Sequence, residues 1–186
     1  MKKVILIFSM LLISKNINAA GIFDNTIFGI AFINQSVDIE VTTTGSVDNS
    51  TDSGSGFGLY LDKYYKRKFR FNSTISYIGY DTFDIAQLML SADYLLPVNS
   101  RISFFGGLAA GGALQKYSDA GAGDSALGSV YGVQLGGIAF INDNLMLELG
   151  YRLRPSSGIE TEVEGTGSII SVTDLSETYF SILLMF

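Results

Sequence analysis

The sequence predicts an all-β fold: an eight-stranded antiparallel up-and-down transmembrane β-barrel. Apolar and polar residues alternate at period two along most of the chain, as they do in strands whose two faces meet different environments. The chain is rich in strand-forming aromatic residues, with 10 Tyr and 13 Phe, and it has only 2 Pro. The connections between the predicted strands alternate between long and short, which is typical of a barrel that crosses a membrane.

Residues 1–19 predict a secretory signal peptide. Lys2 and Lys3 precede an apolar stretch over residues 4–13, and Ala19 ends a plausible cleavage site. The apolar stretch is shorter than the roughly 20 residues that a membrane helix needs, and an N-terminal membrane anchor is the alternative. We therefore expect a signal peptide over residues 1–19 and a β-barrel domain over residues 20–186.

Eight segments carry the period-two pattern. It is clearest over residues 145–154, where Leu145, Leu149 and Leu153 share one face while Glu148 and Arg152 share the other. Most of the segments are near or above the roughly 9–11 residues with which a tilted strand crosses a bilayer. The predicted strands are 26–40, 55–64, 68–80, 84–96, 101–116, 127–141, 145–155 and 174–186.

The lengths of the connections alternate along the chain. Those after the second, fourth and sixth predicted strands are tight, near residues 65–67, 97–100 and 142–144. Three of the others are long and polar, and only the connection near Asp81 is short. A transmembrane barrel has long loops outside and tight turns in the periplasm, whereas a soluble β-sandwich has no reason to sort its loops in this way. The long connections are 41–54, 117–126 and 156–173.

The polar face of the predicted strands carries charged residues, which we expect inside the barrel. An Arg that faces lipid at the middle of the bilayer costs ~2–4 kcal/mol, so the charges should point inward. Buried charges are tolerated when they are paired, and we expect ion pairs between strands across the lumen. A conduction or binding path is the alternative. The candidates are Asp62, Arg70, Asp93, Glu148, Arg152 and Arg154.

Apolar residues on the same inward face cluster towards the ends of the strands at the tight turns. We expect them to close the lumen there, which argues against an open pore. These residues are Leu95, Phe105, Ile138, Phe140, Leu183 and Met185.

The charge of the chain limits its partners. Without residues 1–19 it has 9 basic and 18 acidic residues and a net charge of −9, which repels nucleic acid. Segment 63–68 holds 4 of the 9 basic residues. We interpret this segment as a periplasmic turn flanked by aromatic residues, because nucleic-acid binding needs a broader basic surface.

The end of the chain carries a resemblance. Phe180, Ile182 and Leu184 alternate before a final Phe186, and this pattern resembles the terminal strand of outer-membrane proteins. With the signal peptide, the chain resembles the opacity-type surface antigens and the OmpA/OmpX-type small barrels; residues 93–97 and 104–107 also resemble the opacity type. The resemblance implies a location in the bacterial outer membrane, in contact with its lipid. It also implies that the barrel-assembly machinery reads the terminal strand.

We expect no enzymatic activity and no cofactor. The chain has no His, so the commonest general base and metal ligand at neutral pH is missing. Acidic residues in the long connections, such as Asp48 and Asp119, are interpreted as solvated rather than as calcium ligands. The resemblance implies adhesion, host interaction or envelope integrity through loops 41–54, 117–126 and 156–173. A small pore or apolar-solute transporter is the alternative, and an exported soluble ligand-binding barrel is the third possibility.

Overall fold

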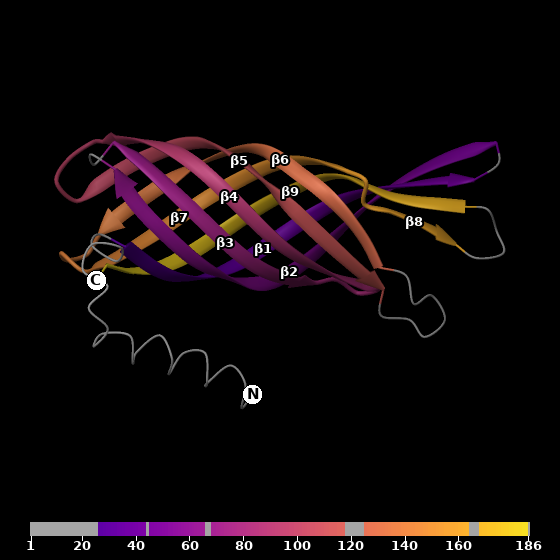
Figure 1. The fold of residues 1–186 in the computed structure, drawn as a ribbon, viewed down its shortest axis with the longest axis horizontal. Helices are drawn as coiled ribbons and strands as arrows, with labels where there is room; N and C mark the ends of the chain where they lie inside the picture. Colours follow the sequence, from indigo (N-terminus) through magenta and orange to yellow (C-terminus); the bar gives the residue numbers. More distant parts are fainter. Residues whose placement is uncertain (1–25, 44, 66–67, 118–124, 164–167, 186) are drawn as a thin grey trace, which may run out of the picture.

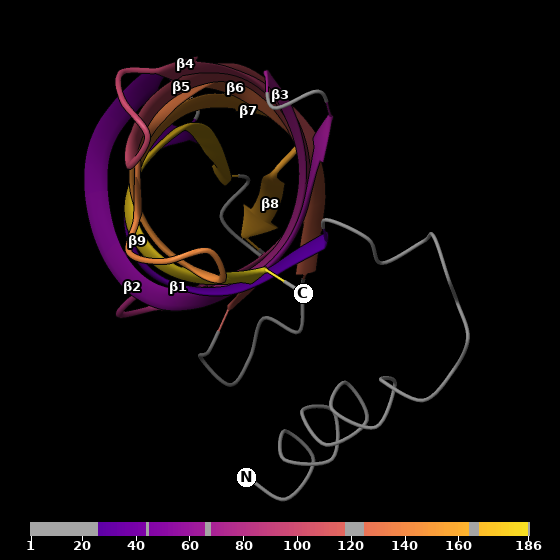
Figure 2. The same cartoon turned by 90° about the vertical axis from the view of Figure 1, so that its left-hand side faces the viewer.

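The computed structural model describes residues 26–185 except 44, 66–67, 118–124 and 164–167. The predicted signal peptide and Phe186 lie outside these residues. Antiparallel pairing joins each barrel strand to the next, and β1 pairs with β9 to close the ring (Figures 1 and 2). The prediction of a closed eight-stranded antiparallel barrel is confirmed. The strands are β1 (Thr26–Thr43), β2 (Ser46–Tyr65), β3 (Phe69–Gly79), β4 (Phe83–Pro97), β5 (Ile102–Tyr117), β6 (Ser125–Phe140), β7 (Leu145–Ser157), β8 (Glu160–Val163) and β9 (Ser168–Met185).

The barrel has two different ends. At the end that we call the turn end, tight connections join β2 to β3, β4 to β5 and β6 to β7, and β9 finishes there. Asn side chains fix two of these turns: Asn99 Oδ1 accepts hydrogen bonds from the backbone of Arg101 and Ile102, and Asn142 Oδ1 accepts them from Asn144 and Leu145. At the opposite end, the sheet end, several strands continue beyond the barrel wall (Figure 1). No helix in the described ranges is long and apolar enough to cross a membrane.

Two of the predicted long loops are mostly strand, and the prediction of loops 41–54 and 156–173 is wrong in this respect. β1 runs on to Thr43 and β2 starts at Ser46, with Gly45 at a φ of 100° in the turn between them. Segment 156–173 contains β8 and the start of β9. The described residues of segment 41–53 are exposed or half-buried on both faces, so the apolar–polar alternation fades there, although Val and Thr residues still favour strands. Most of loop 117–126 lies outside the described residues.

The extensions form one antiparallel sheet at the sheet end, in the order β2–β1–β9–β8. β1 pairs with β2 up to Thr43↔Ser46 and with β9 up to Thr42↔Ile169. β8 pairs with β9 from Glu160↔Ser171 onward. β3 reaches β2 only at Ser55, so among the described residues the segment 46–53 pairs with β1 alone. One edge of this sheet is therefore an open strand.

The barrel wall is apolar outside and mixed inside. Large side chains stand exposed on the outer face, among them Phe57 at 66% and Leu108 at 69% exposure. A water-soluble barrel buries such residues, whereas a membrane barrel presents them to lipid. This outer surface is the largest apolar surface of the molecule and needs an apolar environment to cover it.

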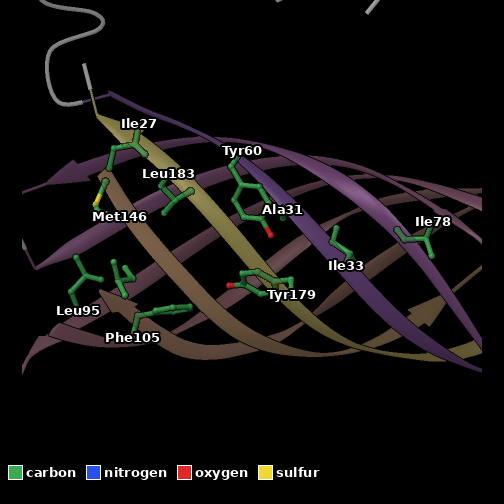
Figure 3. Close-up of a cluster of buried hydrophobic side chains, with 11 residues drawn as sticks. Ile27, Ala31, Ile33, Tyr60, Ile78, Leu95, Phe105, Met146, Tyr179 and Leu183 are labelled. Atoms are coloured by element: carbon green, nitrogen blue, oxygen red, sulfur yellow. The ribbon is translucent and has the colours of Figure 1, made fainter. Parts of the chain in front are cut away.

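Apolar side chains also fill both parts of the lumen. One cluster extends from the turn end along β1, β2 and β9, with the rings of Tyr60 and Tyr179 facing each other at 5.8 Å between centroids (Figure 3). A second cluster lies towards the sheet end around Phe83 and Ile159. The apolar residues expected inside at the turn end are there: Leu95, Phe105, Ile138 and Leu183 are buried in the first cluster, and Phe140 and Met185 pack against it.

Candidate functional site

The lumen holds a group of charged side chains built around Arg70 of β3. Its guanidinium donates to Asp93 Oδ2 on β4 at 2.8 Å and pairs with Glu148 on β7, directly across the barrel. Asp62 on β2 lies 3.5 Å from it. The planar guanidinium also lies 4.4 Å from the centroid of the Phe105 ring. Arg suits this position because its five N–H donors in a fixed fork can serve several carboxylates at once.

A second group is built around Glu177 of β9. Its Oε1 accepts from Arg152 at 2.7 Å, and its Oε2 pairs with Arg154, so one carboxylate holds two guanidinium groups of β7. Arg152 also lies 4.1 Å from the centroid of the Tyr179 ring, a cation–π contact. All seven charged side chains of the two groups are buried. Among them are the six that the sequence placed on the polar face.

Neutral side chains join the two groups. Gln134 donates to Asp93 and to Ser91, and its Oε1 accepts from Arg152 at 2.8 Å. Tyr179 donates its hydroxyl to Glu148 Oε1 at 2.7 Å while its ring contacts Arg152. The two charged groups therefore form a single hydrogen-bonded network across the lumen.

The network continues to the sheet end through two glutamines. Gln35 donates to Glu177 at 2.9 Å and accepts from Gln87, whose own oxygen accepts from Arg154. Tyr80, in the connection between β3 and β4, donates its hydroxyl to Gln35 at 2.7 Å. Burial, and then the Glu177 carboxylate, raises the pKa of the Tyr80 phenol, so it remains a donor at neutral pH.

Glycine makes room for these large interior side chains. A Cβ at Gly150 would lie 2.3 Å from the Tyr179 ring, and one at Gly136 would lie 2.5 Å from the Phe105 ring. The rings therefore lie flat over backbone that has no side chain of its own, and they occupy the space that a wider lumen would leave to water. The arrangement is a filled interior rather than an open path.

A residue from the extension closes the lumen at the sheet end. Ile159, just before β8, is fully buried in the second apolar cluster with Val37, Val172 and Leu175. Its carbonyl accepts from the backbone N–H of Val172 at 3.0 Å, and Gly158 before it has a φ of 80°. The positive φ turns the chain back over the barrel mouth, a conformation that favours glycine.

The open edge of the protruding sheet is exposed and acidic. Residues 46–51 and 53 are exposed along the edge. The sequence over residues 34–55 and 156–178 contains no Lys or Arg, and the described residues of the sheet include Asp38, Glu40, Asp48 and Asp52. An exposed strand edge offers unpaired backbone N–H and C=O groups to another extended chain.

Three residues of the network, Glu177, Gln35 and Tyr80, are not among those predicted from the sequence. Glu177 could have been found, because Leu183 was placed inside and the same parity, counted back along β9, gives Tyr179 and Glu177. Gln35 and Tyr80 carry no signal of their own, since neutral polar residues also occupy outer and loop positions. Among the described residues, no group of three or more Asp, Glu, His or Cys is arranged to hold a metal ion.

The proposed assembly residues lie on the outer face of the last strand. Phe180, Ile182 and Leu184 are exposed at 44%, 49% and 45%. Phe180 lies opposite Phe32 of β1, and Ile182 lies opposite Ile30. Phe186 is outside the described residues.

Comparison with known proteins identifies the fold but no sequence relative. No protein-family model and no curated protein matches the sequence. The crystal structure of Neisserial surface protein A superposes with a TM-score of 0.61 at 14% identity, covering 84% of this chain and 97% of that one. The outer membrane protein OprG from Pseudomonas aeruginosa gives 0.48 at 15% identity, covering 86% of this chain and 96% of that one. Ail, the attachment invasion locus protein of Yersinia pestis, gives 0.45 at 16% identity, covering 84% and 99%. The chain has the fold of the small eight-stranded outer-membrane β-barrels.

Proposed function

We propose that this protein is a non-enzymatic surface protein of the bacterial outer membrane. In this proposal its barrel spans the membrane and its protruding sheet binds an extended, basic segment of a partner protein. The signal peptide over residues 1–19 directs export, and the barrel-assembly machinery reads the terminal strand. The turn end faces the periplasm and the sheet end faces outward.

The observation that carries the proposal is the open edge of β2 over residues 46–53. Natural proteins commonly protect an exposed edge with Lys, Pro, a bulge or a covering segment. Segment 46–53 has neither Lys nor Pro, and its pairing with β1 is regular throughout. An extended peptide that adds to such an edge gains main-chain hydrogen bonds, while side chains at alternate positions provide specificity. The acidic residues of the sheet favour a partner with Lys or Arg at those positions.

The lumen supports a binding rather than a catalytic role. Asp93, Glu148 and Glu177 each accept a hydrogen bond from an arginine or glutamine inside the barrel. All three carboxylates are buried among these partners, so none of them faces solvent. The function therefore belongs to the exposed sheet, and the barrel supports it.

A peptide-array experiment tests this proposal. The purified protein in detergent micelles is applied to an immobilised array of 12-residue peptides. Hydrogen exchange of the protein's backbone amides is then measured with and without each retained peptide. We expect the retained peptides to be rich in Lys and Arg and to protect alternate backbone amides of residues 46–53, because an added strand bonds to every second residue.

Two charge reversals at the same end provide a matched pair. Asp48→Lys lies on the edge, whereas Asp81→Lys lies in the exposed connection between β3 and β4. Asp48→Lys should weaken binding of a basic peptide by up to about five-fold for each exposed pair lost, and more where the new charge repels. Asp81→Lys should have little effect. Equal weakening by both variants, or protection of a segment other than 46–53, contradicts binding at the edge.

A further inference from the structure

We propose that the turn end binds one anionic phospholipid of the phosphatidylglycerol class. Its phosphate would lie at Lys68 and Arg101, and one acyl chain would lie in an apolar groove on the outer wall of β3 to β6. This inference rests on the proposed insertion into the outer membrane and specifies a lipid of the leaflet at the turn end.

Charge is separated between the two ends of the barrel. Of the exposed basic side chains in the described residues, Lys63, Lys68 and Arg101 lie at the turn end and Lys116 lies at the sheet end. Among the described acidic residues outside the lumen, Asp143 alone lies at the turn end; those at the sheet end are Asp38, Glu40, Asp48, Asp52, Asp81, Asp84, Glu160, Glu162 and Asp174. The turn end therefore favours anions, and the sheet end repels them.

Backbone hydrogen bonds fix the positions of the two basic residues. The carbonyl of Lys68 accepts from the backbone N–H of Leu95 on β4 at 2.7 Å. The carbonyl of Arg101 accepts from the backbone N–H of Phe140 on β6 at 2.8 Å, and its own N–H donates to Asn99. Lys68 precedes β3 and Arg101 precedes β5, with β4 between these strands, so the two cations lie on the same rim.

Exposed aromatic side chains lie on the wall beside these cations. Phe69 and Tyr94 are exposed at 45% and 44%, and their rings meet edge to face at 5.4 Å between centroids. Tyr and Trp are enriched where a membrane protein passes from hydrocarbon to head groups. A cation next to such a ring is placed at head-group level, where it meets phosphate rather than acyl chains.

A groove continues from this level along the outer wall. It is a shallow depression, open to the outside, with a volume of about 620 Å³ over β3 to β6. It forms because Ala92 lies opposite Leu108, and Ala110 lies opposite Leu90 and Tyr131, so short side chains lie between long ones. An apolar groove of this kind accepts a chain of methylene groups.

The groove and the basic rim are the right distance apart for one lipid. Lys68 is held at Leu95, three residues beyond Ala92 on β4, which is a stretch of about 10 Å at a strand rise of roughly 3.3 Å per residue. Half the hydrocarbon core of a bilayer is about 15 Å thick. A lipid whose phosphate lies at the rim therefore carries its acyl chain along Ala92.

Electron paramagnetic resonance with spin-labelled lipids tests the inference. The full chain without residues 1–19 is inserted into phosphatidylcholine vesicles that contain a trace of spin-labelled phosphatidylglycerol or phosphatidylcholine, and the fraction of immobilised label is measured. A basic residue near a membrane surface attracts an anionic lipid by ~1 kcal/mol, about five-fold. The immobilised label reports all lipids around the barrel, of which the proposed site holds one. We therefore expect the wild type to prefer phosphatidylglycerol over phosphatidylcholine by about two- to three-fold.

Variants separate the rim from the rest of the molecule. The double variant Lys68→Gln/Arg101→Gln should lower the preference to near one, as should 1 M salt, while Lys116→Gln at the other end should leave it unchanged. Ala92→Leu/Ala110→Leu, which fills the groove, should reduce the immobilised phosphatidylglycerol without changing rim charge. A wild-type preference near one, or a preference unchanged in Lys68→Gln/Arg101→Gln, overturns the inference. Heat-dependent migration on a gel reports insertion: a chain that fails to insert refutes the membrane location itself.

Discussion

Glu177 is the side chain on which the second charged group depends. It is the carboxylate partner of both Arg152 and Arg154, and Gln35 also donates to it. Removing one member of a buried ion pair is costly, typically roughly 3–5 kcal/mol, because the remaining charge is left without compensation. Replacing Glu177 leaves two adjacent guanidinium groups without that compensation, so its effect should lie at the upper part of this range.

We predict that Glu177→Gln strongly lowers the free energy of unfolding of the barrel. The substitution preserves the shape of the side chain and removes its charge, so the effect reports the ion pairs. Asp174→Asn is a matched control on the same strand, because Asp174 is exposed and should tolerate the same chemical change. The measurement is the urea concentration at which half of the protein in lipid vesicles is unfolded. Unfolding is detected as the loss of the heat-dependent gel shift. Similar midpoints for the two variants would show that the lumen charges contribute little.

At the scale of the strand, the sequence predicts strands correctly within the belt of exposed apolar residues. It fails to predict the parts of the strands that lie beyond this belt. The outward positions of β1 change from Ile30 and Phe32 to Asn34 and Ser36. Where one face meets an apolar environment, alternation marks a strand; where both faces meet water, the same strand looks like a polar loop. The parity of β3, β4 and β7 was therefore accessible from the sequence, whereas the protruding sheet was not.

Strand stagger limits what the sequence can say about the lumen. Arg70 and Glu148 were both placed inside by parity, but their contact depends on the heights of β3 and β7 relative to each other. That relation is fixed by registers such as Arg70↔Asp93 and Ile138↔Glu148, which accumulate around the barrel. A one-residue slip reverses the faces of a strand, so parity excludes it, yet a two-residue slip preserves parity and changes every partner. The set of interior charges was predictable, and their partners were not.

The orientation of the protruding hairpin can be tested with single cysteines. The chain has no Cys, so a substitution introduces a unique thiol. We predict that Ser50→Cys in β2 reacts with a membrane-impermeant maleimide on intact cells, because the sheet end faces outward in the proposed orientation. Asp143→Cys, in the tight connection between β6 and β7, should react only after the outer membrane is broken. The reverse pattern would place the turn end outside and remove the proposed binding edge from the cell surface.

At the scale of the whole molecule, side chains block the lumen at both ends and in between. Apolar side chains close the turn end around Leu95 and Leu183, and Ile159 closes the sheet end. Between them the network of charged and amide side chains connects seven barrel strands, β1 to β4, β6, β7 and β9, through contacts such as Arg70–Glu148 and Arg152–Glu177. The interior of an eight-stranded barrel is just wide enough for side chains to fill, and side chains fill it in this protein.

The closed lumen predicts that the purified protein does not form stable ion channels in planar bilayers. An ion that crosses would have to separate Arg70 from Glu148 and displace Ile159, so long-lived open events should be absent at moderate voltage. Combined replacement of Ile159 and Phe105 by Ala should leave the ion pairs in place and test the apolar closures separately. We expect that variant to show brief openings at most, because the charged network still blocks the centre. Steady conductance from the wild-type protein would contradict the closed lumen, and it would favour the alternative of a small pore over a barrel that only supports a binding sheet.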